Sequence, residues 1–340
     1  MINIYTDKTF LTQKYRRYLF PLLLDLFFLK DKTLLSYFTI VENVSDSDVV
    51  ILPIDYVSFL AHKSAFRSLL HLARKNNKVV WLYAAGDFGF TSYLENSYVF
   101  RLGGFDSKFN TNTYIMPSFI SDPYKEHLQF EFKSIKREEQ PSIGFVGHAQ
   151  GGLLKYVKEY INYLKYDIKR RSKLLLADKQ SFYPSSVKRA GYLVKLTNSG
   201  LFKTDFIFRN KYRAGAKLDI ERNKTAKEFY ENIYNNAYTF CLRGVGNFSV
   251  RFYETLATGR IPILIDTDCR LPLHEIIDWS KHCVIIKENE PMEEQVLKFH
   301  NKLSNIEFQE LQQLNRELWL SSLKRDGYFK LMHQEFKKNE

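Results

Sequence analysis

Short apolar runs alternate along the chain with longer stretches of helical periodicity, a pattern typical of α/β proteins with parallel sheets. In the first half this pattern predicts strands at residues 2–5, 49–52, 79–82 and 114–116. In the second half it predicts strands at residues 142–147, 206–208, 238–242, 261–265 and 283–286. We therefore expect two parallel sheets, one in each half of the chain.

Helix boundaries are indicated by capping patterns. Residues 225–228 and 304–307 both read Thr or Ser, two further residues and Glu, which is the capping-box pattern of a helix start. A helix over about 250–258 is predicted to end at Gly259, because glycine is favoured just after a helix terminus. A further helix is predicted to start near Pro291.

Membrane and disulfide signals are weak. The early apolar stretch 19–29 contains Asp25 and is shorter than the about 20 residues that a membrane span needs, so it predicts a core helix. No signal peptide is visible in the sequence. The three cysteines form no Cys-x-x-Cys pair, which favours a reducing compartment over a disulfide framework or a zinc site. We expect a cytoplasmic protein.

A charged run that ends at Pro141 predicts a domain boundary. We expect a first Rossmann-like domain over 1–140, a second over 141–303, and a helical segment over 304–340 that packs back on the first domain. Parallel sheets bind ligands outside the carboxyl ends of their strands. Three aspartates follow predicted strands of the first domain and are expected to face one crevice: Asp7, Asp55 and Asp87.

The charge of the chain is concentrated in one region. The net charge is +12, and residues 155–217 hold sixteen Lys or Arg against four acidic residues, so the remainder is formally neutral. Such a region attracts polyanions, whether nucleotide phosphates, acidic glycans, anionic lipid or nucleic acid. For the predicted helix within 155–173, a merely solvated basic face is an equally good interpretation.

Residues 238–266 contain the most informative pattern. A buried strand leads into the glycine loop 243–247, a helix then starts near Ser249, and a second buried strand follows. Glycines let a phosphate approach the backbone, and a helix N-terminus offers free N–H groups. Arg251 and Glu254 share one helix face, which places a cation suited to a diphosphate beside a carboxylate suited to ribose. A helix cap with a surface Arg–Glu pair is the alternative.

The same segment resembles exostosin-like proteins, glycosyltransferase family 47. The matching positions occur in the same order as in that family: 238–242, Gly246, Ser249, Arg251, Glu254, Gly259, 261–263, 271–272 and 277–279. Weaker similarities at 83–89, 114–117 and 143–147 extend the resemblance to about 50–290. The chain has Arg243 where the family usually has proline and Arg260 where it has cysteine, which suggests a distant, bacterial branch.

The resemblance implies a GT-B fold, in which two Rossmann-like domains face a cleft and the second holds a nucleotide-sugar. It also implies inversion at the sugar without a catalytic metal. By this similarity Arg251 contacts the donor diphosphate, and Glu254 holds the ribose or orients Arg251. No cofactor is expected, since the nucleotide-sugar is a substrate.

Other residues are candidates for binding and catalysis. Asp87 is the predicted general base that accepts the acceptor's proton, with Asp55 and His62 as alternatives and a capping aspartate as the ordinary interpretation. Cations after the strand 206–208 are predicted to reach the leaving phosphates, although a solvated loop explains them equally well. The full set predicted to contact the donor is Gly147, His148, Arg209, Lys211, Arg213, Arg243, Gly244, Gly246, Asn247, Ser249, Arg251 and Glu254.

These observations predict an inverting glycosyltransferase that moves a sugar from a UDP-sugar to a glycan in bacterial surface polysaccharide synthesis. The basic region suggests an anionic or lipid-linked acceptor and peripheral contact with the inner membrane face. Two alternatives stay open. One is a non-enzymatic nucleic-acid or polyanion-binding protein, although no known nucleic-acid-binding pattern appears. The other is a metal-dependent transferase that uses Asp266 and Asp268.

Overall fold

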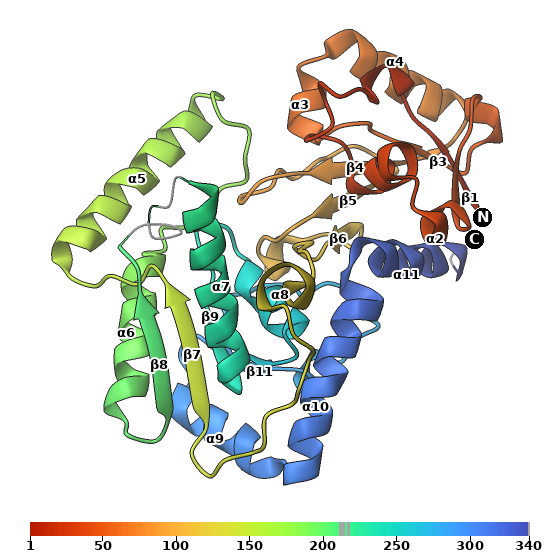
Figure 1. The fold of residues 1–340 in the computed structure, drawn as a ribbon. Helices are drawn as coiled ribbons and strands as arrows, with labels where there is room; N and C mark the ends of the chain where they lie inside the picture. Colours follow the sequence, from red (N-terminus) through yellow and green to blue (C-terminus); the bar gives the residue numbers. More distant parts are fainter. Residues whose placement is uncertain (211–214, 216–217, 339–340) are drawn as a thin grey trace.

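The computed structural model describes residues 1–210, 215 and 218–338, which form two parallel β-sheets flanked by helices (Figure 1). The first sheet has six strands in the order β2-β1-β3-β4-β5-β6. Their bounds are β1 Ile2–Tyr5, β2 Phe38–Ile40, β3 Val49–Ile51, β4 Val79–Ala84, β5 Ser97–Arg101 and β6 Thr113–Ile115. All its neighbouring strands are parallel, which requires a crossover between each pair.

The second sheet has five strands in the order β11-β10-β9-β7-β8, also all parallel. Their bounds are β7 Ser142–Gly147, β8 Lys203–Phe208, β9 Tyr238–Cys241, β10 Ile261–Asp266 and β11 Val284–Lys287. The first five residues of β10 are all buried, as expected for a strand covered on both faces. Two parallel-sheet domains with helical crossovers are the GT-B architecture, so the predicted fold class is confirmed.

The first half contains short helices at α1 Pro21–Leu23, α2 Lys32–Leu35 and α3 Tyr56–Leu60, and a longer one at α4 Lys63–Lys75. The second half contains α5 Leu153–Arg171, α6 Ser185–Asn198, α7 Asp219–Asn235, α8 Val250–Ala257, α9 Met292–Lys302, α10 Asn305–Leu318 and α11 Arg325–Lys338. None of the helices in the described ranges is both long and apolar enough to cross a bilayer.

Helix α11 returns to the first sheet (Figure 1). Its aromatic residue Phe336 packs against Trp81 with ring centroids 4.4 Å apart. Tyr328 and Phe329 are fully buried in the same apolar cluster. Because these rings complete the core of the first half, the C-terminal segment is a structural part of it.

The sequence predicted nine of these strands to within three residues at each end. It missed β2 and β5, since β2 has three residues and β5 contains Ser97 and Arg101, which do not look like strand-core residues. The capping box at 304–307 is confirmed, because Ser304 and Glu307 cap α10 reciprocally. The capping box predicted at 225–228 is wrong, because α7 already begins at Asp219. Within that helix the Thr225 hydroxyl donates to the carbonyl of Arg222.

Candidate functional site

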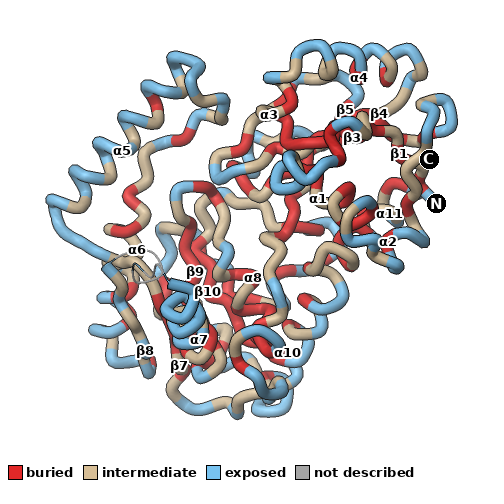
Figure 2. Tube along the Cα trace, turned by 45° about the horizontal axis from the view of Figure 1, so that its top comes forward, coloured by how far each residue is buried: buried red, intermediate tan, exposed pale blue. Residues whose placement is uncertain are grey.

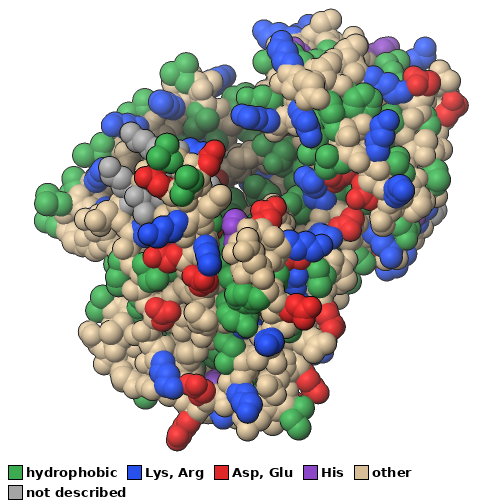
Figure 3. Space-filling model, in the orientation of Figure 1, with side chains coloured by type: hydrophobic (Ala, Val, Ile, Leu, Met, Phe, Trp, Pro, Cys, Tyr) green, Lys and Arg blue, Asp and Glu red, His purple; other side chains and the backbone are tan. Residues whose placement is uncertain are grey.

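A cleft of about 890 Å³ opens between the two sheets, and its hollow is visible in Figure 3. This volume is within the about 300–1,000 Å³ typical of ligand sites. Most of its wall comes from segments at the carboxyl ends of β7, β8 and β9, where parallel sheets place ligands. Nine of the predicted site residues line it: Asp87, Gly147, His148, Arg209, Gly244, Gly246, Ser249, Arg251 and Glu254.

Arg251 lies in the first turn of α8 and reaches back over the end of β7. Its Nη2 donates to the carbonyl of Val146 at 2.7 Å. Its guanidinium lies 4.4 Å from the ring centroid of Phe145 and 5.8 Å from that of Phe229. Burial lowers the pKa of Arg251. The close approach of the Arg251 guanidinium to β7 requires a glycine at position 147, because a Cβ there would lie 2.8 Å from Nη2 of Arg251.

Two further arginines share the cleft wall. Arg189 of α6 donates to the carbonyls of His148 (2.7 Å) and Arg243 (3.0 Å). Burial lowers its pKa to about 10, and the charge of Arg251 contributes. Arg209 bonds to Glu228 at 2.5 Å. In all three arginines the Nε–H is buried without a hydrogen-bond partner among the described residues.

The sequence motifs did not single out Arg189. Arg189 entered the sequence analysis only as one of the basic residues of 155–217. A single arginine within a helix has no motif that distinguishes it from a solvent-exposed cation.

His148 makes two contacts that define its state. Its Nδ1 lies 3.0 Å from the carbonyl of Arg209, so this nitrogen donates. Its Nε2 lies 2.7 Å from Lys155 Nζ, an obligatory donor, so this nitrogen accepts. The ring is therefore neutral with its proton on Nδ1, and it positions the Lys155 ammonium at the cleft.

Asp87 lies on the cleft's opposite side, in the loop after β4. It is exposed, and its carboxylate makes no hydrogen bond or ion pair with another described residue. Its main chain meets the glycine loop of the second half, since a Cβ on Gly246 would lie 2.2 Å from its carbonyl oxygen. This places a free carboxylate from one half beside the glycine loop of the other.

The expectation that three aspartates face one crevice is wrong. Asp7 caps a short 3₁₀ turn by accepting from the Thr9 amide at 3.0 Å. Asp55 caps α3 and is buried. His62, the other alternative base, packs its ring on Phe10 and does not line the cleft. Only Asp87 of these candidates faces the cleft.

Arg243 and Asn247 do not line the cleft either, contrary to the prediction. Arg243 is buried between the rings of Phe105 and Tyr183, at 5.3 and 4.9 Å from their centroids. Asn247 Nδ2 lies 2.9 Å from each of three carbonyl oxygens, including that of Gly104 in the first half. Both side chains join the two halves.

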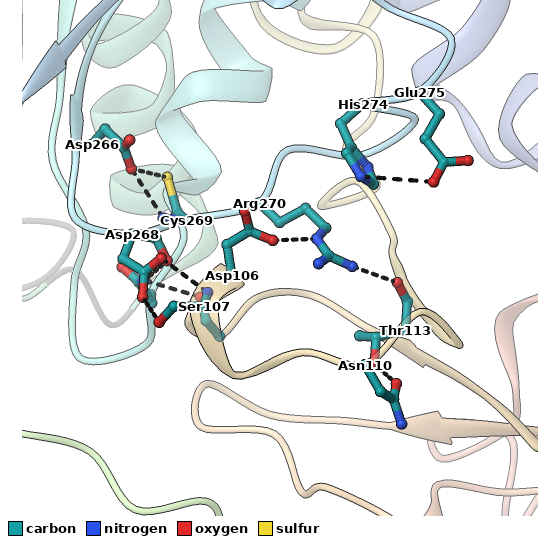
Figure 4. A network of polar contacts seen from close by, with 12 residues as sticks. Asp106, Ser107, Asn110, Thr113, Asp266, Asp268, Cys269, Arg270, His274 and Glu275 are labelled. Atoms are coloured by element: carbon teal, nitrogen blue, oxygen red, sulfur yellow. Dashed lines mark hydrogen bonds and ion pairs between the residues drawn. The ribbon is translucent and has the colours of Figure 1, made fainter.

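The Asp266–Asp268 pair is occupied by protein contacts (Figure 4). Asp266 accepts from the Cys269 amide at 3.0 Å. Asp268 accepts from the Ser107 amide at 3.0 Å and hydroxyl at 2.6 Å, across the seam between the halves. Within the described ranges no three His, Cys, Asp or Glu side chains are grouped to hold a metal. Lys211 and Arg213, two predicted cations, lie outside the described residues.

The N-terminus of α8 completes the site. Ser249 is its N-cap residue, and its side chain makes no capping hydrogen bond. The first amides of α8 are thus not capped by a side chain, and the positive end of the helix dipole lies at the cleft. Gly244, which precedes it in the glycine loop, has open space where a Cβ would be. These features suit an anion that approaches the backbone closely.

Part of the chain is similar to a known family. Residues 169–303 match the model of the Exostosin GT47 domain. An exostosin-1 homolog from Caenorhabditis elegans is 37% identical over 65 residues, which are 18% of this chain and 17% of that protein. Human exostosin-like 1 is 34% identical over 79 residues, 23% of this chain and 10% of that protein. The matches thus span less than a fifth of either relative.

Solved structures with a similar outline include a glycosyltransferase from Rickettsia africae, which is 11% identical, with 100% of this chain and 99% of that one covered and a TM-score of 0.40. WaaG, a glycosyltransferase involved in lipopolysaccharide biosynthesis, is 11% identical over 86% of this chain and 76% of that one, with a TM-score of 0.32.

The two parallel-sheet domains and the cleft between them define a GT-B architecture. Within that architecture, residues 169–303 are similar to the Exostosin GT47 domain, so the chain is exostosin-like over this segment.

Proposed function

We propose that the cleft binds the diphosphate of a nucleotide-sugar, a UDP-sugar, and that the enzyme transfers the sugar to a glycan with inversion at the anomeric carbon. The observation that carries this proposal is the group of three half-buried arginines, Arg189, Arg209 and Arg251. Each has a buried Nε–H without a partner in the described structure.

Buried cations with unmet N–H groups destabilise a protein, because desolvation is not offset by a partner. The cleft is lined by six Lys or Arg side chains and only two acidic ones, Asp87 and Glu254. A diphosphate supplies both the negative charge and the acceptor oxygens that these groups lack. The open amides at the start of α8 add further donors.

The proposed reaction is a single displacement. The acceptor hydroxyl attacks the anomeric carbon from the face opposite the diphosphate, and its proton passes to the Asp87 carboxylate. The bond from the anomeric carbon to the diphosphate oxygen breaks, and its electron pair leaves with the diphosphate. Arg251 and its neighbours stabilise the charge that develops there. Glu254, one helical turn after Arg251, is proposed to hold the ribose hydroxyls.

The acceptor is proposed to be an anionic or lipid-linked glycan of bacterial surface polysaccharide, reached from the cytoplasmic side. The arginines neutralise the leaving group in this scheme, so transfer is proposed to be metal-independent. Full activity in excess EDTA would support that part, and loss of activity restored by Mn²⁺ would favour the alternative with Asp266 and Asp268.

The first experiment is a thermal-shift screen against UDP, GDP, CDP and their sugars. A ligand at 100 times its dissociation constant adds about 2.7 kcal/mol to stability, which is readily measured. Arg251→Lys and Arg189→Lys keep the charge but lose the planar fork of donors, so each is expected to weaken donor binding more than tenfold. Arg74→Lys, at an exposed position on α4, is the matched control.

Transfer is then measured with the ligand that binds. Asp87→Asn is expected to retain donor binding and to lose transfer, because only proton acceptance is removed. If no nucleotide stabilises the protein, or if both arginine variants bind as the wild type does, the proposed donor site is wrong.

A further inference from the structure

Helix α5 presents its apolar side outward. Leu154, Val157, Ile161, Leu164 and Ile168 follow one another at intervals of three and four residues, so they form one stripe along the helix. Their exposed fractions are 88, 45, 45, 40 and 65%. In Figure 1 the helix stands at the edge of the molecule, and Figure 2 shows exposed positions along most of its length. We call these five residues the α5 stripe.

The opposite side of α5 combines polar and aromatic residues and faces the protein, where Tyr156, Tyr160 and Tyr163 contact the ring of Phe182. Asp167 is its one buried residue and pairs with Arg170 at 2.9 Å and Arg171 at 2.7 Å. Tyr166 stacks on Phe88 with ring centroids 4.2 Å apart. A surface helix normally turns its apolar side inward and its polar side to water. On α5 an aromatic side already packs on the protein, and the aliphatic side is exposed in addition, so the fold does not bury the α5 stripe.

The charges beside the stripe are all of one sign. The exposed charged residues of α5 are Lys158, Lys165, Lys169 and Arg171. The two acidic residues of the helix turn inward, since Asp167 is buried and the Glu159 side chain is 17% exposed. Pairing α5 with a second copy of itself would bring Lys158, Lys165 and Lys169 together with no exposed acidic partner on the helix. An anionic surface complements them.

We propose that α5 docks the protein on an anionic lipid bilayer, with the α5 stripe in the interface and the lysines against the headgroups. At 1.5 Å per residue the helix is about 28 Å long, and it lies along the surface without spanning it. Its first turns reach the cleft, because Lys155 and Lys158 line it. Docking therefore brings the cleft mouth beside the bilayer, which is where the lipid-linked acceptor of the proposed function, on which this step rests, would lie.

The test is flotation of the full chain with vesicles of phosphatidylglycerol and phosphatidylcholine, compared with phosphatidylcholine alone. Each basic side chain near an anionic surface contributes a factor of about five to binding. Lys165→Gln with Lys169→Gln, neither of which lines the cleft, should thus weaken binding roughly 30-fold. Ile161→Ser with Leu164→Ser should weaken it more than about tenfold through lost apolar contact.

The matched control is Ile306→Ser with Leu314→Ser, two exposed apolar residues on α10 at 69 and 52% exposure. It should bind vesicles as the wild type does. Failure of the wild type to bind anionic vesicles, or equal binding by all variants, would overturn the proposal. So would a dimer in sedimentation that the α5 substitutions dissociate, since a second copy would then be the occupant. Vesicle binding is measured without sugar transfer, so its failure is distinguishable from failure of the proposed donor site.

Discussion

The contact between the glycine loop and the Asp87 loop leads to a sharp prediction for Gly246→Ala. An added Cβ would lie 2.2 Å from the carbonyl oxygen of Asp87 and 2.8 Å from a ring carbon of Phe248. Favourable contacts need about 3.5 Å, so the Asp87 backbone must retreat by roughly 1 Å. Overpacking of this kind costs about 1–3 kcal/mol. A misplacement of this size at a reacting group lowers the rate by about 100-fold.

Gly244→Ala is the matched comparison, because it adds the same methyl group two residues away. Apart from its two chain neighbours, no heavy atom of the described residues lies within 4 Å of a Cβ at Gly244. Its backbone is not in the left-handed region, so alanine is tolerated and can even stabilise by about 0.4–1 kcal/mol. Urea denaturation should separate the two variants by at least about 1 kcal/mol. Turnover by Gly246→Ala should fall while donor affinity changes little. Equal stability of both variants would refute the packing of this loop on Asp87.

Two further predictions concern buried titratable groups. Burial raises the pKa of Asp25 to about 7 despite its ion pair with Arg325 at 3.0 Å. The folded state therefore holds a proton that the unfolded state has lost. Stability should fall as pH rises from about 4 to 7, by up to about 1.4 kcal/mol per pH unit, and urea denaturation of Asp25→Asn should show no such decline. Burial also raises the pKa of the Cys241 and Cys269 thiols to about 12, and it raises the pKa of Cys283 well above its ordinary value. All three should resist Ellman's reagent at pH 8 and react once the protein is unfolded; a rapid reaction of the native protein would contradict their burial.

The strands were predictable because parallel strands buried on both faces read as continuous apolar runs. Strand β5 was not predicted because it ends at Arg101, a residue type that rarely indicates a buried strand. Arg101 is 2% exposed and donates to the carbonyl of Gly103. A buried arginine in a strand depends on partners elsewhere in the chain, such as Asp178 at 2.9 Å. No local pattern contains that information.

Part of the cleft lining was predictable from the sequence, because the spacing of residues along a helix decides which side chains share a face. Arg251 and Glu254 are three residues apart on α8, and both line the cleft. The glycine loop has no such periodicity. Arg243 and Asn247 flank it in sequence but turn toward Phe105 and Gly104 of the first half. The direction of a loop side chain is set by tertiary contacts, and these come from residues about 140 positions earlier.

The three cleft arginines show why this site should be a binding site and not a structural one. Two arginines outside the cleft have partners: Arg260 Nε donates to the Tyr234 carbonyl at 2.9 Å, and Arg316 holds Asp122 with two bonds of 2.9 and 2.7 Å. Arg243 also leaves its Nε–H unmet, but it lies between the rings of Phe105 and Tyr183. Arg189, Arg209 and Arg251 leave their Nε–H groups unmet in a water-accessible cleft. Like charges gathered this closely destabilise the unliganded fold, and a bound polyanion removes that repulsion. Ligand stabilisation should therefore decrease with ionic strength, because the attraction between a diphosphate and three cations is partly screened by salt.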